Sequence, residues 1–501
     1  MHSSRAKWLY ALLSALLALG LFFSFWYTVV SPANEFAFDP NDDESFVMVK
    51  TEVFRAYVPK NIEVIVFSDT LSPYGKDIDD LSQNGLGGVV GWAENGKYFI
   101  STRTKGKKVI LNAESKELFA SLSSLRSVEL SMVDTSRVED FSRFFYGCTA
   151  LEMADISAFN IGKAKSLRSM FMNCSSLREV SLGEGKGAGV LDVGFMFAGT
   201  GDLASVDLGD WDLSSVICST AMFQGTGAKT VALPRSLTTL GAFFFNHASA
   251  YEGEEYTIAK EISTLGLAHL FYNFGTESFV SFSVEEGSTA AKAIDGVLYS
   301  FDGGVLLAVP KGKTFAGGVF EIAEGVTLLG ELSFSRNQNI KTLLLPNSYR
   351  VTVYTELDHS DFADLGGSGN KSTGNSLNLA TYIYSGVEAF AVKADNPTYA
   401  AKDGILYGRG ESGEAAALVA VPVGYSGVLS VAEGVTSWEK EALWEADGVY
   451  FSAVTEIRIP KTLISIAPSQ LEKINSLAAR VLVDAENPVY TTDGEGKIVL
   501  K

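Results

Sequence analysis

The sequence predicts a repeat solenoid, in which coils stack on one another through short parallel strands joined by loops and short helices. Phenylalanine recurs every 26 residues, and aliphatic residues keep the same step on either side of it. The chain has 501 residues, of which 47% are hydrophobic and 20% charged, so it can bury a large core. A long apolar segment near the N-terminus adds a predicted transmembrane helix in front of the solenoid.

The apolar segment, residues 8–30, contains 23 residues without a formal charge. It is long enough to cross a bilayer of about 30 Å as a helix. Arg5 and Lys7 precede it and acidic residues follow it, which predicts a cytoplasmic N-terminus and an extracellular body, residues 34–501. We therefore expect a single-pass protein of the cell membrane, with residues 1–33 as cytoplasmic tip and signal anchor.

A cleaved signal peptide is the alternative interpretation of this segment. Ser31-Pro32-Ala33 offers a cleavage site with small residues at the required positions, although the apolar run is longer than usual. Cleavage after Ala33 would make the protein secreted. Both interpretations export the rest of the chain.

The exported part is strongly acidic. Without Arg5 and Lys7 it holds 38 basic residues against 59 acidic ones, a formal charge of −21. This charge argues against a nucleic acid partner, which requires a basic surface. It also argues against a body lying flat on anionic lipid, so membrane contact is expected through residues 8–30 alone.

The 26-residue period defines the coils of the solenoid. Within each coil the segment LRSVEL (residues 125–130) returns as LEMADI, LREVSL and LASVDL. This L-x-x-L-x-L pattern predicts a short strand with alternate side chains pointing inward, and it is typical of leucine-rich repeats. The phenylalanines in step are Phe119, Phe145, Phe171, Phe197 and Phe223.

Two longer stretches carry a family resemblance. VDTSRVEDFSRFFYGCTAL (residues 133–151) and FNIGKAKSLRSMFMNCSSL (residues 159–177) resemble the repeat of BspA-like leucine-rich repeat surface proteins of bacteria. That repeat has roughly the form D-T-S-x-V-x-x-M-x-x-M-F-x-x-C-x-x-L. The resemblance implies an extracellular bacterial surface protein that acts in adhesion, by binding host matrix protein, other cells or surface polymers.

A second repeat type begins at VALPRSLTTLGAFFF (residues 231–245), where the strand ends in proline. DGVLY and DGILY recur about 110 residues apart, and the second copy belongs to a D-N-P-x-Y…D-G-x-L-Y hairpin at residues 395–407. Residues 247–279 and 350–390 fit no coil cleanly, so the sequence leaves the coil phase open there, and GGSGNKSTGNS (residues 366–376) predicts a flexible excursion. The expected organisation after residue 33 is a small β-rich lead-in at 34–111, the solenoid of 26-residue coils at 112–241, and a second array with insertions at 242–501.

Catalytic and metal-binding motifs do not emerge from the sequence. The four histidines are scattered, and neither G-x-S-x-G nor H-E-x-x-H occurs. We expect no enzymatic activity, no cofactor and no metal site.

Cys148 and Cys174 occupy the same position of consecutive coils, and Thr200 and Thr226 follow in the next two. A position shared by cysteine and threonine indicates packing of a small side chain. A disulfide is the alternative, because equivalent residues of stacked coils lie about 4.8 Å apart, within the Cα range of a disulfide, and an exported protein permits one. The third cysteine, Cys218, has no such neighbour, so the chain is no disulfide-dense module.

Outward positions of the predicted strands carry carboxylates, and they form the candidate ligand-binding strip. Its members are Glu129, Asp155, Glu179 and Asp207. On a concave face they would attract a basic partner, whereas the alternative is a solvated face of an acidic chain. One cation shared by Asp155 and Asp207 is not expected, because two rungs separate them by about 10 Å. The predicted function is binding of a macromolecule, and its alternative is a structural spacer or envelope-assembly role without a specific receptor.

Overall fold

The fold was analysed in a computed structural model, which describes residues 38–70, 78–183, 187–265, 270–329, 333–334, 337–349, 386–440, 442–443 and 453–501. The predicted membrane-spanning segment 8–30, the alternative cleavage point after Ala33 and the predicted excursion 366–376 lie outside these residues. Within the described part of the chain, no helix has both the length and the apolar character needed to cross a membrane.

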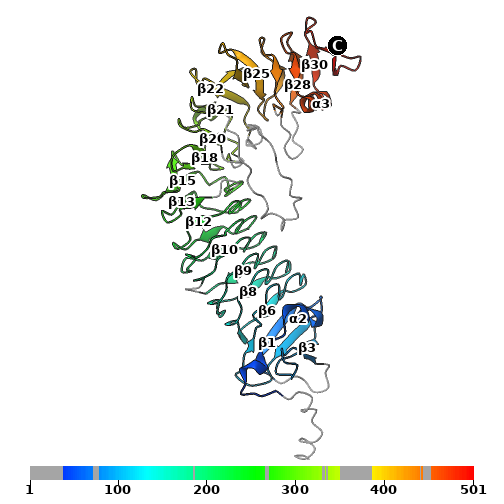
Figure 1. The fold of residues 1–501 in the computed structure, drawn as a ribbon, viewed down its shortest axis with the longest axis vertical. Helices are drawn as coiled ribbons and strands as arrows, with labels where there is room; N and C mark the ends of the chain where they lie inside the picture. Colours follow the sequence, from blue (N-terminus) through cyan, green and yellow to red (C-terminus); the bar gives the residue numbers. More distant parts are fainter. Residues whose placement is uncertain are drawn as a thin grey trace, which may run out of the picture.

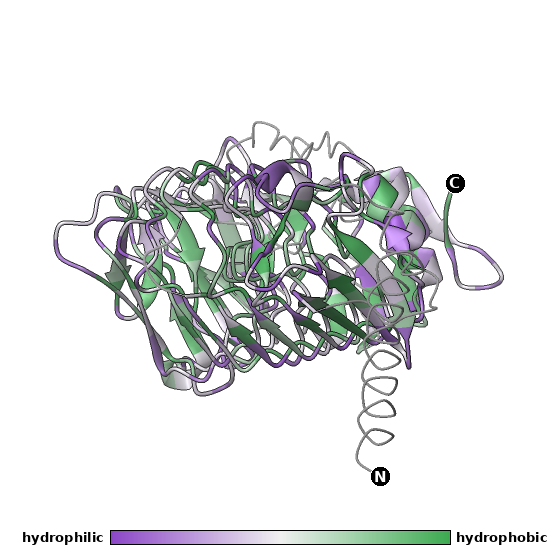
Figure 2. Ribbon diagram, turned by 90° about the horizontal axis from the view of Figure 1, so that it is seen from below, coloured by the Kyte–Doolittle hydropathy of each residue, from purple (hydrophilic) through white to green (hydrophobic). Residues whose placement is uncertain are grey.

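The coils stack into one elongated, curved column, with the N-terminal part at one end and the C-terminal part at the other (Figure 1). The hydrophobic core runs along this column as three large clusters that overlap in sequence, at residues 48–308, 297–420 and 405–498, and two small clusters lie beside the first. Viewed along the column, the strands are mainly hydrophobic and many of the loops around them hydrophilic (Figure 2). The structure is mostly short strands with few helices, as the sequence predicted.

The N-terminal part begins the stack with a five-stranded sheet in the order β2-β3-β4-β1-β6. The strands β3 and β4 form a hairpin around Asn95-Gly96, both of which have positive φ. Strand β1 pairs in parallel with β6 of the first coil, Val64 lying opposite Ser127, so the lead-in continues directly into the coils. The elements are η1 (Asp43–Phe46), α2 (Thr51–Tyr57), β1 (Val64–Ser68), β2 (Asp79–Asp80), β3 (Val90–Glu94), β4 (Lys97–Ser101) and β5 (Val109–Ile110).

One strand per coil builds the main parallel ladder. The pairs β8–β9, β10–β11 and β13–β15 are parallel and in register, and the predicted L-x-x-L-x-L segments form strands as expected. The strands are β6 (Ser127–Glu129), β8 (Met153–Asp155), β9 (Glu179–Ser181), β10 (Ser205–Asp207), β11 (Thr230–Ala232), β13 (Glu255–Ile258) and β15 (Ser281–Val284). Two-residue strands pair elsewhere on the coils: β5 with β7 (Val133–Asp134), and β12 (Thr239–Leu240) with β14 (Thr264–Leu265).

The phenylalanine ladder runs through the interior of these coils. The rings of Phe119, Phe145, Phe171, Phe197 and Phe223 stack with centroids 5.4 to 5.7 Å apart. Each coil also hydrogen-bonds the next, for example from the Phe171 amide to the Met196 carbonyl at 2.9 Å. The predicted ladder is confirmed.

The ladder extends further than the sequence predicted. Phe245 stacks on Phe223, and Phe271 on Phe245, both at 5.6 Å. The described residues of 247–279 therefore contribute a coil whose phase the sequence pattern left open. The step from Phe223 to Phe245 is 22 residues instead of 26, because the turn after the strand is shorter in the second repeat type. The shorter step hides the 26-residue period in the sequence.

The second array adds antiparallel hairpins to the column. In β16–β17–β18 and β23–β24–β25 each chain segment pairs with the next, and the turns Asp295-Gly296 and Asp403-Gly404 have positive φ at both residues, as such tight hairpins require. The predicted hairpin at residues 395–407 is thus confirmed. Its strands are β16 (Ala291–Ile294), β17 (Val297–Ser300), β18 (Val305–Ala308), β23 (Tyr399–Lys402), β24 (Ile405–Arg409) and β25 (Ala415–Ala420).

Parallel pairing resumes between the hairpins. The ladders are β19–β21–β22 and β26–β28–β30, and a last hairpin, β31–β32, follows. The remaining elements are η2 (Ala316–Gly318), β19 (Val319–Glu321), β20 (Leu328–Leu329), β21 (Thr342–Leu345), β22 (Ala389–Val392), β26 (Gly427–Ser430), β27 (Ser437–Trp438), β28 (Val454–Ile459), β29 (Ser465–Ile466), α3 (Pro468–Ser476), β30 (Arg480–Val483), β31 (Tyr490–Thr492) and β32 (Ile498–Leu500).

Candidate functional site

The candidate site is the strand face, which we define as the outward positions of β6, β8, β9, β10, β11, β13 and β15. Each strand directs one central residue inward and its two neighbours outward, because side chains alternate along a strand. The fourteen outward positions hold five carboxylates and no lysine or arginine: Ser127, Glu129, Met153, Asp155, Glu179, Ser181, Ser205, Asp207, Thr230, Ala232, Glu255, Thr257, Ser281 and Ser283.

The register divides these carboxylates between two columns. Asp155 lies opposite Ser181, whereas Glu179 lies opposite Met153. Glu129, Asp155 and Asp207 therefore share one column, and Glu179 belongs to the next. The structure places all four predicted strip residues on one face without joining them in a single row.

Glu255 is a fifth carboxylate of the strand face that the sequence did not predict. It is exposed at the start of β13 and accepts a hydrogen bond from the Ser283 hydroxyl at 2.7 Å. It was missed because its coil lies within residues 247–279. The alternation of Glu255, Tyr256, Thr257 and Ile258 was the signal that could have found it.

Two of the strip residues also accept hydrogen bonds from the backbone of the turn that follows their strand. The Asp155 carboxylate accepts from the Ser157 amide at 2.9 Å, and Asp207 accepts from the Gly209 amide at the same distance. Such side chains stabilise the turn that follows a strand. Glu129 and Glu179 are exposed and form no ion pair with another described residue.

Beside the strand face runs a column in which charges compensate one another. Glu152 lies between Arg126, at 2.9 Å, and Arg178, at 3.9 Å, and Arg126 also approaches Glu63 at 3.8 Å. These side chains are partly exposed, so each pair contributes only about 0–1 kcal/mol. The arrangement leaves the negative charge of the strand face uncompensated on the face itself.

A groove opens at the ends of β11 and β13. It has a volume of about 220 Å³, and Val231, Leu233, Tyr256 and Ile258 contribute to an apolar lining. Arg235 and Glu285 stand at its edge. We name it the β11–β13 groove.

Charges at the edge of this groove are paired across coils. The Arg235 guanidinium donates to Glu285 at 2.5 Å and to Glu261 at 3.1 Å. Hydrogen bonds from Arg235 and from the Lys260 amide lower the pKa of Glu285 to about 2. The edge therefore keeps its ion pairs over the whole range of physiological pH.

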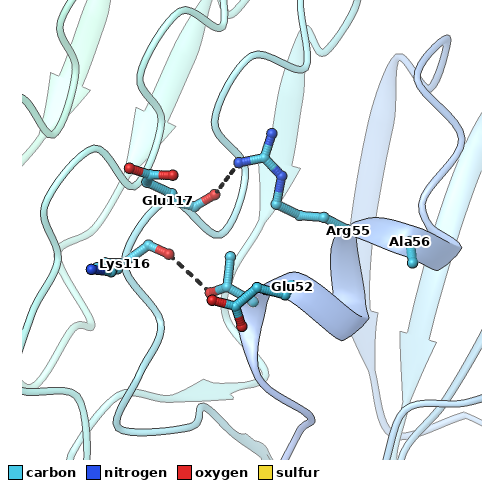
Figure 3. A pocket seen from close by; sticks show the side chains of 6 residues that line it. Glu52, Arg55, Ala56, Lys116 and Glu117 are labelled. Carbon is cyan, nitrogen blue, oxygen red and sulfur yellow. Dashed lines mark hydrogen bonds between the residues drawn. The ribbon is translucent and has the colours of Figure 1, made fainter.

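A larger and more open pocket of about 400 Å³ lies where α2 meets the first coil (Figure 3). Arg55 reaches from α2 and donates to the Glu117 carbonyl at 3.1 Å, while the Thr51 hydroxyl donates to the Lys116 carbonyl at 2.9 Å. These bonds fasten α2 to the coil. Glu52, Arg55, Lys116 and Glu117 give the walls two acidic and two basic side chains, without a nucleophile and base in contact.

The described residues contain no cluster of side chains that could bind a metal ion. No group of three or more histidine, cysteine, aspartate or glutamate side chains in that part of the chain could hold an ion. His247, the histidine of the described coils, contacts Asn273 and Tyr272.

Cys148 and Cys174 are buried free thiols. Cys148 donates to the Phe119 carbonyl and Cys174 to the Phe145 carbonyl, both at 3.0 Å. Burial raises the pKa of Cys148 to about 12 and that of Cys174 well above its usual value. In the structure both thiols are free, and each faces a carbonyl oxygen one coil away; the disulfide considered for this pair stays a hypothesis.

One family model matches part of the chain. A family model described as "Mycoplasma protein of unknown function, DUF285" matches residues 113–234, which contain the 26-residue coils. None of the curated proteins compared with the chain matches it.

Among solved structures, the chain is similar to a leucine rich cell surface protein from Faecalibacterium prausnitzii, at 15% identity and a TM-score of 0.43, over 85% of this chain and 88% of that one. A leucine-rich repeat protein from Eubacterium ventriosum matches at 14% identity and a TM-score of 0.38, over 82% and 97%. The pneumococcal vaccine antigen PcpA matches at 14% identity and a TM-score of 0.36, over 85% and 91%. Two of these three structures are named as leucine-rich proteins, and one of the two as a cell surface protein.

Proposed function

We propose that this chain is a bacterial surface protein that binds a basic macromolecule through its strand face. The observation that carries the proposal is the charge of that face, where fourteen outward positions on seven neighbouring strands include five carboxylates and no basic side chain. Long solenoid surfaces suit the recognition of macromolecules, and a face of one charge speeds association with a partner of the opposite charge. The motif resemblance and the predicted export segment support a place at the cell surface.

The partner class follows from the same chemistry. A host matrix protein, a surface protein of another cell or a cationic surface polymer would meet the strand face with lysine, arginine or amine groups. The repeated rungs, about 4.8 Å apart, offer such a partner several equivalent contacts. The role proposed is adhesion without catalysis, by a protein that is anchored through residues 8–30 or secreted.

Binding of biotinylated poly-L-lysine and of purified matrix proteins to residues 34–501 tests the proposal. A variant with Glu129→Gln, Asp155→Asn, Glu179→Gln and Asp207→Asn removes four charges and keeps amide oxygens to accept the turn hydrogen bonds. We expect a loss of roughly tenfold or more in affinity, together with a weaker salt dependence, because fewer ion contacts form.

A matched control removes four exposed carboxylates away from the strand face: Glu139→Gln, Asp202→Asn, Glu286→Gln and Glu411→Gln. This control should bind like the parent protein. Equal capture by the parent and the strand-face variant would remove the strand face from the binding site. Absence of capture with every probe would favour the structural spacer instead.

A further inference from the structure

We propose that the β11–β13 groove receives one large apolar side chain of the bound partner. The partner is then an extended polypeptide segment that carries an aliphatic or aromatic residue close to basic residues. This inference rests on the proposed function and specifies the class of partner that the strand face binds.

The groove lies where the repeat type changes and the turns after the strands become shorter. In two of the 26-residue coils, the turn after the strand contains a buried aromatic side chain, Phe159 after β8 and Trp211 after β10. After β11 and β13 this turn is four residues shorter: it runs from Leu233 to Leu237 and from Ile258 to Ile262, where the 26-residue coil has Leu208 to Val216, and it contains no aromatic residue. Two successive turns without the large ring leave the space open.

The lining of the groove suits an apolar group. Ile258 and Ile262 are buried, whereas Val231, Leu233 and Ala259 remain only partly covered by the core. The volume of about 220 Å³ is below the roughly 300–1,000 Å³ of typical small-molecule pockets and is on the scale of a single side chain. Anchors of this kind, an apolar side chain in a pocket near the centre of an interface, dominate many protein complexes.

The groove is continuous with the strand face. Ala232 lies opposite Asp207 in the parallel register, and Thr257, the next outward residue of that column, lines the groove. Two rungs separate Asp207 from Thr257, a distance of about 10 Å, which an extended chain covers in about three residues. A partner with a basic residue over Asp207 can therefore place a side chain two or three positions away into the groove.

The charges around the groove indicate which residues of the partner should flank its apolar side chain. The edge of the groove is balanced, because Arg235 is paired with Glu261 and Glu285, and Lys260 also acts on Glu285. The uncompensated charge nearby is negative and belongs to Asp207 and Glu255 on the strand face. A polypeptide with basic residues around its apolar side chain matches both features, whereas a polyamine chain has no group for the groove.

Two fluorescein-labelled synthetic peptides test the inference with residues 34–501. Both alternate lysine and glycine, and one has a central leucine, flanked by lysines, where the other has alanine. We expect the leucine peptide to bind roughly tenfold more tightly, because burial of its additional methyl and methylene groups adds to the ionic contacts.

Two variants then separate the groove from the strand face. Ala259→Phe fills the groove, and Leu233→Gln makes its wall polar. Two different variants are used so that a folding defect in one of them does not decide the result. Each should reduce the affinity of the leucine peptide to that of the alanine peptide and leave the alanine peptide unchanged. Thr264 is exposed on β14 in the same coil, so Thr264→Phe is the control. This control should preserve the difference in affinity between the leucine peptide and the alanine peptide.

The outcomes distinguish the inference from the proposed function. If both peptides bind the parent equally, or if both groove variants keep the leucine preference, the groove is not an anchor site, while the strand face still binds basic partners. If neither peptide binds the parent, the inference and the basic-partner function are both overturned.

Discussion

At the scale of single residues, the slot shared by Cys148, Cys174, Thr200 and Thr226 shows what a repeated position requires. All four side chains are at most 3% exposed. Each side chain carries a thiol or hydroxyl group that can donate a hydrogen bond. The two cysteines donate to carbonyls one coil away. The Thr200 hydroxyl donates to the Phe197 carbonyl at 2.8 Å and lies 3.1 Å from the Thr226 hydroxyl. The slot therefore selects a small side chain that can donate.

This requirement predicts the effect of substitutions at Cys174. Cys174→Thr should change stability by less than about 1 kcal/mol, because the donor is retained. Cys174→Leu should destabilise the surrounding coils by about 1–3 kcal/mol, because the close-packed slot cannot take the added volume. Native-state hydrogen exchange at the amides of Phe145, Phe171 and Phe197 measures the local effect.

The same variants test whether a disulfide joins Cys148 and Cys174. A disulfide between Cys148 and Cys174 would make Cys174→Thr strongly destabilising, and mass spectrometry of the parent without reductant would show a loss of two hydrogens. The sequence predicted the size of the slot from the alternation of cysteine with threonine. It could not predict the acceptors, because the direction of each donor depends on how neighbouring coils are offset.

At the scale of elements, a buried asparagine links each of the hairpins β23–β24 and β31–β32 to the coil before it. The Asn487 side-chain amide donates to the Pro460 and Leu463 carbonyls at 2.8 and 2.9 Å, and its oxygen accepts from the Val489 and Tyr490 amides at 2.9 and 2.8 Å. Asn396 is placed in the same way, donating to the Pro346 carbonyl and accepting from Thr398 and Tyr399.

Asn487→Ala should destabilise the C-terminal coils by about 2–4 kcal/mol, because four buried backbone groups lose their partner. Asn84→Ala, at an exposed loop position, is the control and should have an effect below about 0.5 kcal/mol. Urea unfolding followed by the fluorescence of Trp438, in a variant that keeps this tryptophan alone, reports on the affected cluster. An effect below about 1 kcal/mol would contradict a linking role for the asparagine.

These elements show how far sequence patterns reach. The hairpin at residues 395–407 was predictable because an Asp-Gly turn between alternating residues has one favoured geometry. Glu255 and the β11–β13 groove were not predicted, because the change of repeat type shortens the turns and shifts the phenylalanine step. The 26-residue step alone places Glu129, Asp155 and Asp207 in one column and Glu179 in the column beside it, and the register of the strands agrees with this division.

At the scale of the whole molecule, the aromatic core packing of the described coils joins each coil to the next one. The ring of Phe197 lies between those of Phe171 and Phe223, at 5.7 and 5.5 Å, and no core cluster joins it to residues 405–498. In such a column the stability is close to a sum of coil terms and interfaces between adjacent coils.

Phe197→Ala should therefore destabilise by about 3–5 kcal/mol, through lost burial and the cavity left behind. Hydrogen exchange should accelerate mainly in the coils from Phe145 to Phe245, with little change in residues 405–498. The matched substitution on the exposed surface, Met153→Ala, should leave exchange unchanged. Uniform acceleration along the described chain would contradict this picture and indicate a single cooperative unit.

The in-register parallel ladder has a further consequence for the length of the protein. Since every 26-residue coil presents the same upper and lower surface, a coil could be duplicated or deleted by recombination without creating a new kind of junction. Each such event would shift the distal end by about 4.8 Å and change the strand face by two outward positions. Reach and the number of contact points would then evolve together, in steps of one coil.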